Sequence, residues 1–443
     1  MKARTMQAPK MYLHLLNYWP DLIRLRHLPP ERVRRIQIQR VRRMVEHARV
    51  HSPFYRQLYD KAGVSNLEIR TAEDIRALPT VDKQMMREFG VENVLTVDKN
   101  APGISCDMTS GSSGEPFPVY VRRDANFTSH LRVFYTLFRG GYRPHQRFLM
   151  VWRYEPDRVF EIERQTLLGS VQKHLGLFRR DILSIYQPPE VLVEAIRRGQ
   201  PHVLYAVRSV VELMAHALRR KGEKLSVPLI LTTAETLLPE HRELFSEVFG
   251  SRVINIYGCC EAPTIGVGIS NEGFELFPNV VYLEYDNVVD EGGQSTGEIV
   301  ITNLLNHTMP FIRYRLRDRG RIIDQSEAGL SKFMGPVVGR DDDMIVLPNG
   351  FRFAYHHSYH LLYTFTECKQ YRFVQTPDGA VHLWLVPTDD SEEGRARARQ
   401  KVLAIWHDKF PDLPLDVVFK PSLPLGRTGK HRAIERLEAS ASQ

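Results

Sequence analysis

The stretch MTSGSSGEPFPVY (residues 108–120) places a loop rich in serine, threonine and glycine between two apolar runs. Glycine lets the backbone approach an anion closely, and hydroxyl groups beside main-chain N–H groups can donate hydrogen bonds to it. The loop differs from a Walker A motif, because Gly114 is followed by Glu115 and Pro116 instead of lysine. We predict a phosphate-binding loop, rather than a simple turn, whose balancing cation comes from elsewhere in the chain.

Around this loop, the hydrophobic pattern predicts an α/β fold. Helical periodicity dominates to about Leu78, and from Arg147 onward strand-like apolar runs alternate with amphipathic helical stretches. The strand-like runs are RFLMVWRY, PHVLYAV, VPLILTT and RVINIYG. This alternation is typical of stacked layers of sheet and helix. Short strands with glycine-containing turns follow from about Phe277, and a smaller α+β piece follows Gly339.

The composition indicates a globular protein of two or more domains, with 443 residues, of which 43% are apolar and 25% charged. Much of the net charge of +8 lies in ERVRRIQIQRVRRMVEHAR, where arginines alternate with an apolar helical stripe. We read this segment as a solvated helix and expect no binding of nucleic acid, because no nucleic-acid motif accompanies the charge. The first residues have no uninterrupted apolar stretch, so we expect neither a signal peptide nor a spanning helix there, and the four cysteines form no CxxC pair. We expect a cytoplasmic protein without membrane contact.

Four further motifs carry side chains suited to binding a nucleotide. NIYGCCE (residues 255–261) offers an aromatic ring for a base and a carboxylate for Mg²⁺. RYRLRDRG (residues 313–320) contains Asp318, whose two oxygens could accept both ribose hydroxyls, although the neighbouring arginines make an ordinary salt bridge the alternative. GRDDDMIVLPNG (residues 339–350) follows, and LGRTGKHRAI (residues 425–434) places Lys430 beside Gly429, as a candidate for the missing cation.

Taken in this order, the motifs resemble the adenylate-forming superfamily of acyl-CoA synthetases, adenylation domains and luciferases. The resemblance is strongest to the phenylacetate-CoA ligase branch, near its capsule-biosynthesis and coenzyme F390 synthetase-like members, and extends from about Arg43 to Arg432. It implies a large N-terminal domain of layered sheets and helices, residues 1–338, and a small mobile C-terminal α+β domain, residues 339–443. It also implies an ATP-dependent, AMP-forming carboxylate ligase that uses Mg²⁺.

The resemblance implies a role for each motif. Lys430 and Glu261 would be catalytic, with Glu261 also holding Mg²⁺, and Asp342 would be the hinge between the domains. The ATP-binding residues would be Thr109, Ser110, Gly111, Ser112, Ser113, Gly114, Ala234, Glu235, Tyr257, Gly258, Asp318 and Arg340. Three aromatic residues, Tyr135, Phe138 and Trp152, could line an acyl pocket or simply belong to the core.

Two groups of residues are of types that often bind metals, but we interpret both as structural. We read His356, His357 and His360 as part of a helix, because no third ligand accompanies the pair spaced four residues apart. We read Cys259 and Cys260 as small buried residues at the end of a strand.

Three functions follow from the sequence. The first is activation of a carboxylic acid as an acyl-adenylate with transfer to coenzyme A. In the second, the acceptor is an amine or a carrier protein, or AMP itself passes to a hydroxyl. The third is a non-catalytic binding protein. The sequence leaves the carboxylic acid unidentified and a homodimer open.

Overall fold

The computed structural model describes residues 8–109, 116–152, 180–291, 294–323, 332–340, 344–348, 351–353, 355–362, 365–424 and 433–437. The chain divides into two compact units, Met1–Val337 and Val338–Gln443. This division lies one residue before the predicted one after residue 338. Each unit has its own hydrophobic core: the larger unit contains two clusters of buried residues and the smaller unit contains one.

Helices dominate the start of the larger unit, as the periodicity predicts. They are α1 (Ala8–His27), α2 (Pro30–His51), α3 (Pro53–Lys61), α4 (Ala72–Ala77), α5 (Lys83–Phe89) and α6 (Val91–Val94). In α2 the apolar stripe that includes Val33, Val41 and Met44 is buried, while most of its arginines are exposed or half-buried. The basic segment is therefore an ordinary helix with one face in the core, as expected.

An antiparallel hairpin and a long helix follow. Strands β1 (Ile104–Met108) and β2 (Pro118–Arg122) pair from Ile104 opposite Arg122 to Met108 opposite Pro118. The predicted phosphate-binding loop joins these two strands. Helix α7 (Arg123–Arg139) begins directly after β2.

An eight-stranded sheet forms the centre of the larger unit, in the order β13-β9-β8-β7-β6-β5-β3-β4. Its strands are β3 (Phe148–Trp152), β4 (Arg180–Ser184), β5 (Val203–Val207), β6 (Leu229–Thr233), β7 (Arg252–Tyr257), β8 (Gly266–Gly268), β9 (Phe274–Leu276) and β13 (Phe333–Met334). Strands β3 to β7 are parallel, and β8, β9 and β13 are added in antiparallel pairs. The carboxyl ends of the parallel strands therefore share one edge, where ligands bind in open α/β sheets.

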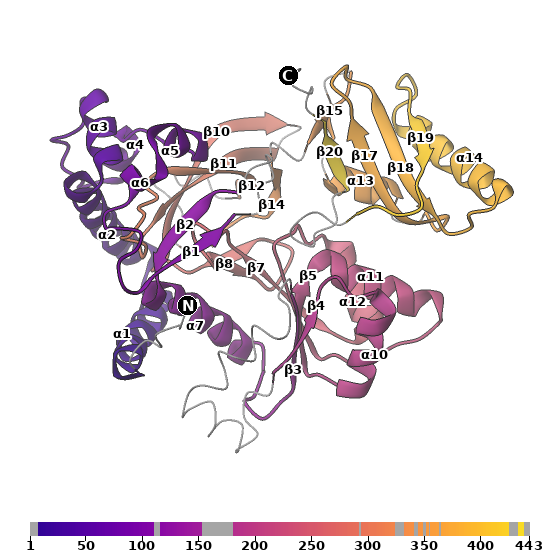
Figure 1. Ribbon diagram of the computed structural model, residues 1–443, viewed down its shortest axis with the longest axis horizontal. Helices are drawn as coiled ribbons and strands as arrows, with labels where there is room; N and C mark the ends of the chain where they lie inside the picture. The colour runs from indigo at the N-terminus through magenta and orange to yellow at the C-terminus, as the bar shows by residue number, and fades with distance from the viewer. Residues whose placement is uncertain are drawn as a thin grey trace. The chain divides into compact units, whose positions relative to one another are not determined.

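Two cores cover the two faces of this sheet. Helices α10 (Pro189–Gly199), α11 (Arg208–Arg220) and α12 (Pro239–Phe249) pack on one face (Figure 1), against Leu204 and Ile230 among others. The neighbouring residues Val203 and Leu229 point into the other core, which also receives α7. This alternation is the pattern expected for a sheet between two layers of helices. The predicted α/β class is confirmed.

A second, antiparallel sheet in the larger unit carries the RYRLRDRG motif. Strands β10 (Val281–Glu291), β11 (Gln294–Asn303) and β12 (Tyr314–Arg321) pair in sequence order. Strand β14 (Val337–Arg340) crosses the boundary between the units. Figure 1 shows α4 and α5 beside β10 and β11, on the side of the sheet where the N-terminal helices gather.

The smaller unit is α+β, as predicted. Its elements are β15 (Ile345–Val346), β16 (Arg352–Phe353), α13 (Tyr355–Leu362), β17 (Cys368–Gln375), β18 (Val381–Pro387), α14 (Glu392–Lys409), β19 (Asp416–Phe419) and β20 (Ile434–Arg436). The main sheet has the order β19-β18-β17-β20, with only the central pair antiparallel. Trp406 of α14 is fully buried and stacks on Phe373 of β17, so helix and sheet share one core.

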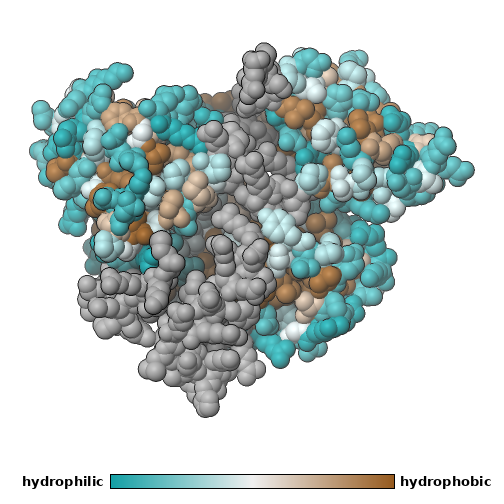
Figure 2. All heavy atoms as spheres, viewed as in Figure 1, coloured by the Kyte–Doolittle hydropathy of each residue, from teal (hydrophilic) through white to brown (hydrophobic). Residues whose placement is uncertain are grey.

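The outer helices of both units carry mainly hydrophilic residues on the face seen in Figure 2, and apolar residues show there as separate patches. Within the described residues, no helix combines the length and apolar character that a membrane span requires.

Candidate active site

A tight loop after β7 presents Glu261 at the carboxyl edge of the central sheet. The Ile265 amide donates to the Tyr257 carbonyl at 2.7 Å, and the Cys259 amide donates to the Ala262 carbonyl at 3.2 Å. Gly258 is required at this point, because a Cβ atom there would lie 2.5 Å from the Thr264 backbone nitrogen. The loop of residues 258–264 therefore folds back on itself directly after the strand.

Glu261 is held at its side chain and at its backbone by donors from two other segments. The Tyr314 hydroxyl donates to Glu261 Oε1 at 2.9 Å, and Asn303 Nδ2 donates to the Glu261 backbone carbonyl at 2.6 Å. Only 8% of Glu261 is exposed. Burial, together with the adjacent carboxylate, raises the pKa of Tyr314 well above its ordinary value, so the hydroxyl stays protonated and continues to donate.

Asp318 reaches the same edge through a β-bulge. Val300 pairs with Arg315 and Glu298 pairs with Arg319, so β12 inserts two more residues than β11 between these pairs, with Arg317 at φ 60°. A bulge changes the direction of side chains along a strand. The Tyr257 hydroxyl donates to Asp318 Oδ2 at 2.9 Å.

Two arginines of this motif, Arg313 and Arg315, pair with acidic residues other than Asp318. Arg313 pairs with Glu284, with 3.3 Å between Nε and Oε2. Arg315 contacts Glu298 at 2.6 Å and Asp286 at 2.9 Å. Arg315 thus joins β12 to β10 and β11, and Arg313, directly before β12, joins it to β10.

Thr109 closes the base of the predicted phosphate-binding loop. The Phe117 amide donates to Thr109 Oγ1 at 3.0 Å, and the Thr109 amide donates to the Phe117 carbonyl at 2.9 Å. The Cys260 thiol lies 3.6 Å from the Met108 carbonyl, which places this base beside the Glu261 loop. Ser110, Gly111, Ser112, Ser113 and Gly114 lie outside the described residues.

The TTAET stretch ends β6 at the same edge. Ala234 has φ 70°, a left-handed conformation that is unusual for a residue with a side chain. Glu235 accepts hydrogen bonds from the Ser209 amide at 2.7 Å and the Ser209 hydroxyl at 2.9 Å, at the first turn of α11. Its carboxylate thus stabilises the amino end of α11, which the sequence did not indicate.

The three predicted pocket aromatics have different immediate ring partners. Tyr135 packs edge-on against Trp19, and Phe138 stacks with Tyr142, all within the core that includes α7. Trp152 packs at 5.4 Å from Tyr205 and contacts the core on the other face. Phe138 and Trp152 are half-buried, and the acyl-pocket role of these three residues stays a prediction.

The residues predicted for the second domain belong to the smaller unit or lie outside the described residues. Arg340 ends β14 in the smaller unit. Asp342 and Lys430 are not among the described residues, so their predicted roles stay predictions.

The histidine motif lies in a helix, as predicted, whereas Cys259 and Cys260 are half-buried and not buried as predicted. Residues 355–362 form α13, and the His357 ring stacks on Phe353. Burial raises the pKa of the Cys259 thiol well above its ordinary value, which disfavours a reactive thiolate. Across the described part of the chain, no group of three or more His, Cys, Asp or Glu side chains is arranged to hold a metal.

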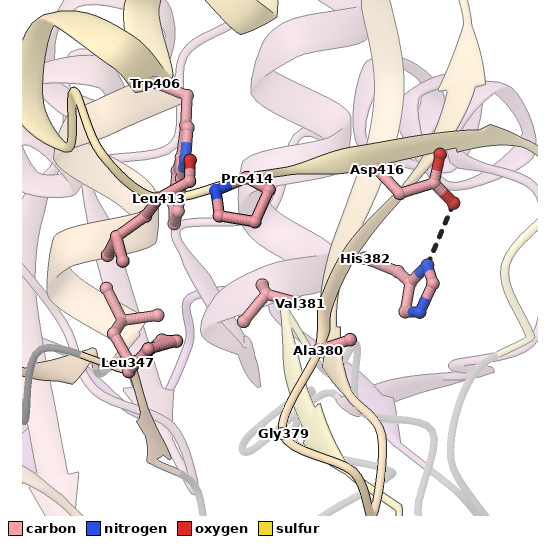
Figure 3. Close-up of a pocket in the computed structure, with 10 residues that line it drawn as sticks. Leu347, Gly379, Ala380, Val381, His382, Trp406, Leu413, Pro414 and Asp416 are labelled. Atoms are coloured by element: carbon pink, nitrogen blue, oxygen red, sulfur yellow. Dashed lines mark hydrogen bonds and ion pairs between the residues drawn. The ribbon is translucent and has the colours of Figure 1, made fainter.

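A cavity of about 130 Å³ lies in the smaller unit (Figure 3). Apolar side chains such as Leu347, Val381 and Trp406 line it, and His382 Nδ1 lies 2.9 Å from Asp416 Oδ2 at its edge. This volume is well below the roughly 300–1,000 Å³ of sites that hold cofactor-sized ligands. The edge of the central sheet in the larger unit is therefore the stronger candidate for an active site.

Several known proteins are similar to this chain. No family model matches the chain. A phenylacetate-coenzyme A ligase of Thermus thermophilus is 28% identical over 353 residues, which span 74% of each chain. Enzymes of the same name from Pseudomonas putida and Escherichia coli are each 24% identical, over 71% and 70% of this chain. The chain is a relative of the phenylacetate-CoA ligases.

The solved structures show that this relative of the phenylacetate-CoA ligases has the fold of adenylate-forming ligases. A 2-hydroxyisobutyryl-CoA ligase in its postadenylation state matches with a TM-score of 0.71 and 17% identity, over 93% of this chain and 91% of that one. An anthranilate CoA ligase in complex with anthranoyl-AMP matches with a TM-score of 0.52 and 16% identity, over 74% and 64% of the two chains. The predicted fold class is confirmed by these structures, and the sequence relatives support the predicted superfamily.

Sequence reasoning missed Asn303 and Tyr314, which hold Glu261. Tyr314 lies inside the RYRLRDRG motif, but nothing in the motif shows that its hydroxyl faces a carboxylate 53 residues earlier. Asn303 ends β11 without any local signal.

Proposed function

We propose that this protein activates a carboxylic acid with ATP to form an acyl-adenylate and then transfers the acyl group to coenzyme A. The observation that carries the proposal is the meeting of Glu261 and Asp318 at one edge of the central sheet, where Tyr314 and Tyr257 donate to their carboxylates. The similarity to phenylacetate-CoA ligases over about three quarters of the chain supports the same reaction class.

In the first half-reaction, an oxygen of the substrate carboxylate would attack the α-phosphate of ATP, and pyrophosphate would leave. Asp318 would accept hydrogen bonds from the ribose hydroxyls, and the Tyr257 ring would face the adenine. The backbone and hydroxyls that begin at Thr109 would hold the β- and γ-phosphates. In the second half-reaction, the coenzyme A thiolate would attack the acyl carbon, and AMP would leave.

The Glu261 carboxylate fits a magnesium ligand. Mg²⁺ in nucleotide sites is bound by one or two carboxylates together with phosphate oxygens. Glu261 is buried, oriented by Tyr314, and adjacent to the base of the phosphate loop. Bound Mg²⁺ would neutralise phosphate charge. Glu261 itself would accept a hydrogen bond from Tyr314 and keep one carboxylate oxygen turned to the metal.

The two units would act as separate domains in this reaction, with Asp342 as the hinge. Lys430 would complete the site for adenylation, and Arg340 would help to hold the ribose. The small domain would then reorient for the transfer to coenzyme A. A cytoplasmic location and a homodimer also remain proposals.

The proposal is tested by ATP–pyrophosphate exchange with a panel of carboxylic acids that includes phenylacetate, aromatic and short hydroxy acids. We expect exchange with at least one acid and a product thioester once coenzyme A is added. If an amide or an adenylylated hydroxyl forms and no thioester does, the acceptor is an amine or a hydroxyl group and not coenzyme A. Binding of MgATP without exchange for any acid would contradict a ligase function and favour a binding protein.

A further inference from the structure

Arg132 is a buried arginine in the middle of α7, one of the largest fully buried side chains among the described residues. Only 1% of it is exposed. A buried guanidinium group must be fully hydrogen-bonded, because it has lost its hydration. Buried charged groups are as a rule paired with a group of opposite charge.

Arg132 faces carbonyl and hydroxyl oxygens instead. Its Nε donates to the Thr264 carbonyl at 3.1 Å, and Nη2 donates to the Pro263 carbonyl. Its Nη1 donates to the Tyr18 hydroxyl at 2.6 Å and to Thr128 Oγ1 at 3.1 Å. Among the ion pairs of the described residues, none includes Arg132. Its charge is therefore used to hold backbone carbonyls in place.

The carbonyls that Arg132 holds belong to the loop that presents Glu261. Thr264 adopts φ 57°, a left-handed conformation that costs free energy for a residue with a branched side chain. Such a conformation persists only where the surroundings enforce it. Two donors from distant segments thus fix the loop: Asn303 at the Glu261 carbonyl, and Arg132 at the two carbonyls that follow Ala262.

We propose that Arg132 is a positioning residue for the metal ligand Glu261, and that Tyr18 orients Arg132 from α1. The inference rests on the proposed function. Arg132 does not touch a substrate; it sets the direction of the loop end, and a displacement of about 0.5 Å is enough to weaken a catalytic constellation. Through these contacts, α1 and α7 would influence how tightly Glu261 binds Mg²⁺.

The test measures how much Mg²⁺ tightens ATP binding, because this ratio does not depend on turnover. Isothermal titration of ATP into the full chain in excess Mg²⁺ and in EDTA gives two dissociation constants. We expect roughly a tenfold ratio for the wild type, within the usual range of coupling between two ligands. Arg132→Lys replaces the five fork-arranged donors of the guanidinium group with three donors on one nitrogen, and we expect a ratio of about threefold or less.

Tyr18→Phe is the milder variant. It removes one hydroxyl but keeps the ring, which Arg132 contacts at 5.9 Å from its centroid. We expect the ratio to fall about twofold, the effect of one hydrogen bond. Arg139→Lys is the matched control on the same helix, because Arg139 binds Glu275 and not the loop. Its ratio should equal that of the wild type.

The outcomes separate the inference from the proposed function. Absence of ATP binding to the wild type would contradict the proposed function itself. A normal wild-type ratio that is unchanged in folded Arg132→Lys would overturn the inference, since a merely structural residue would weaken ATP equally in both buffers. If Arg132→Lys does not fold, Tyr18→Phe decides, and an unchanged ratio there overturns the inference as well.

Discussion

Glu261 receives its geometry from neighbours that are distant in sequence. Tyr314 donates to its carboxylate, and Asn303 donates to its carbonyl. These two donors hold a carboxylate oxygen and the backbone carbonyl oxygen of Glu261 in place. A substitution can therefore remove the negative charge of Glu261 without changing the shape of the site. Glutamine keeps both an acceptor oxygen and the volume of glutamate.

Glu261→Gln should therefore lower the rate of ATP–pyrophosphate exchange by roughly 10² to 10³, as for the loss of one preorganised electrostatic contact. The unfolding midpoint should stay within a few degrees of the wild type, since Tyr314 can still donate to the amide oxygen. Glu272→Gln, at an exposed acid on a nearby loop, is the control and should exchange normally. Wild-type exchange in Glu261→Gln would remove Glu261 from the site.

Tyr257→Phe should weaken ATP binding with little effect on the chemical step. The variant keeps the ring but removes the hydroxyl that orients Asp318 at 2.9 Å. A hydrogen bond to a charged group contributes about 1.5 kcal/mol or more, so the KM for ATP should rise roughly tenfold while kcat changes less than about twofold. Tyr285→Phe, whose hydroxyl donates to the Arg321 carbonyl, should leave the KM unchanged. An equal loss in kcat would indicate that Tyr257 acts in the transition state.

Strand β9 is joined to α1 and α7 by one carboxylate. Glu275 contacts Arg139 at 2.8 Å and also pairs with Arg26. Burial alone would raise the pKa of Glu275, but the hydrogen bonds from Arg139 and Arg26 bring it below its ordinary value. A carboxylate whose pKa is lower in the folded than in the unfolded state stabilises the fold above the unfolded-state pKa. This contribution is lost as the pH falls through the folded-state pKa.

Glu275→Gln should thus destabilise the protein at neutral pH and much less at low pH. The difference in unfolding midpoint between wild type and variant should be constant above about pH 5.5 and shrink below about pH 4.3, the ordinary glutamate pKa. Thermal unfolding between pH 3 and pH 7 measures it. Glu247→Gln on the exposed face of α12 is the control. A difference that grows on acidification would contradict the ion-pair network as the cause.

The division of the chain into two units predicts that the two half-reactions respond differently to changes in the smaller one. Lys430→Ala should slow adenylation by roughly 10² to 10³, because it removes a charge needed only at the α-phosphate. Transfer from a supplied acyl-adenylate should survive. Asp342→Pro restricts φ at the proposed hinge and should show the reverse, with adenylation retained and transfer lost.

Measuring both half-reactions for each variant distinguishes a small domain that reorients between the two steps from a single active site that does not change. Circular dichroism of both variants is the control that checks whether each is folded. Equal loss of both half-reactions in both folded variants would contradict domain alternation. It would place Lys430 and Asp342 in one unchanging active site.

Much of the architecture could be read from the sequence, since it depends on local patterns. The alternation of apolar runs and amphipathic stretches predicted the α/β class, because side chains alternate along a strand and repeat every three to four residues in a helix. The motifs also singled out Tyr257, Glu261 and Asp318, which the structure brings to one edge of the sheet. Their roles in catalysis remain predictions.

Only the tertiary structure decided what holds those side chains. Arg132 and Thr264 are 132 residues apart, and Ser209 lies 26 residues before Glu235, whose carboxylate stabilises the start of α11. The bulge that turns Asp318 toward Tyr257 depends on the pairing of β12 with β11. A hydrogen-bond partner is chosen by proximity in space and by the loss of water around a buried group, and neither is encoded in the local spacing of residues.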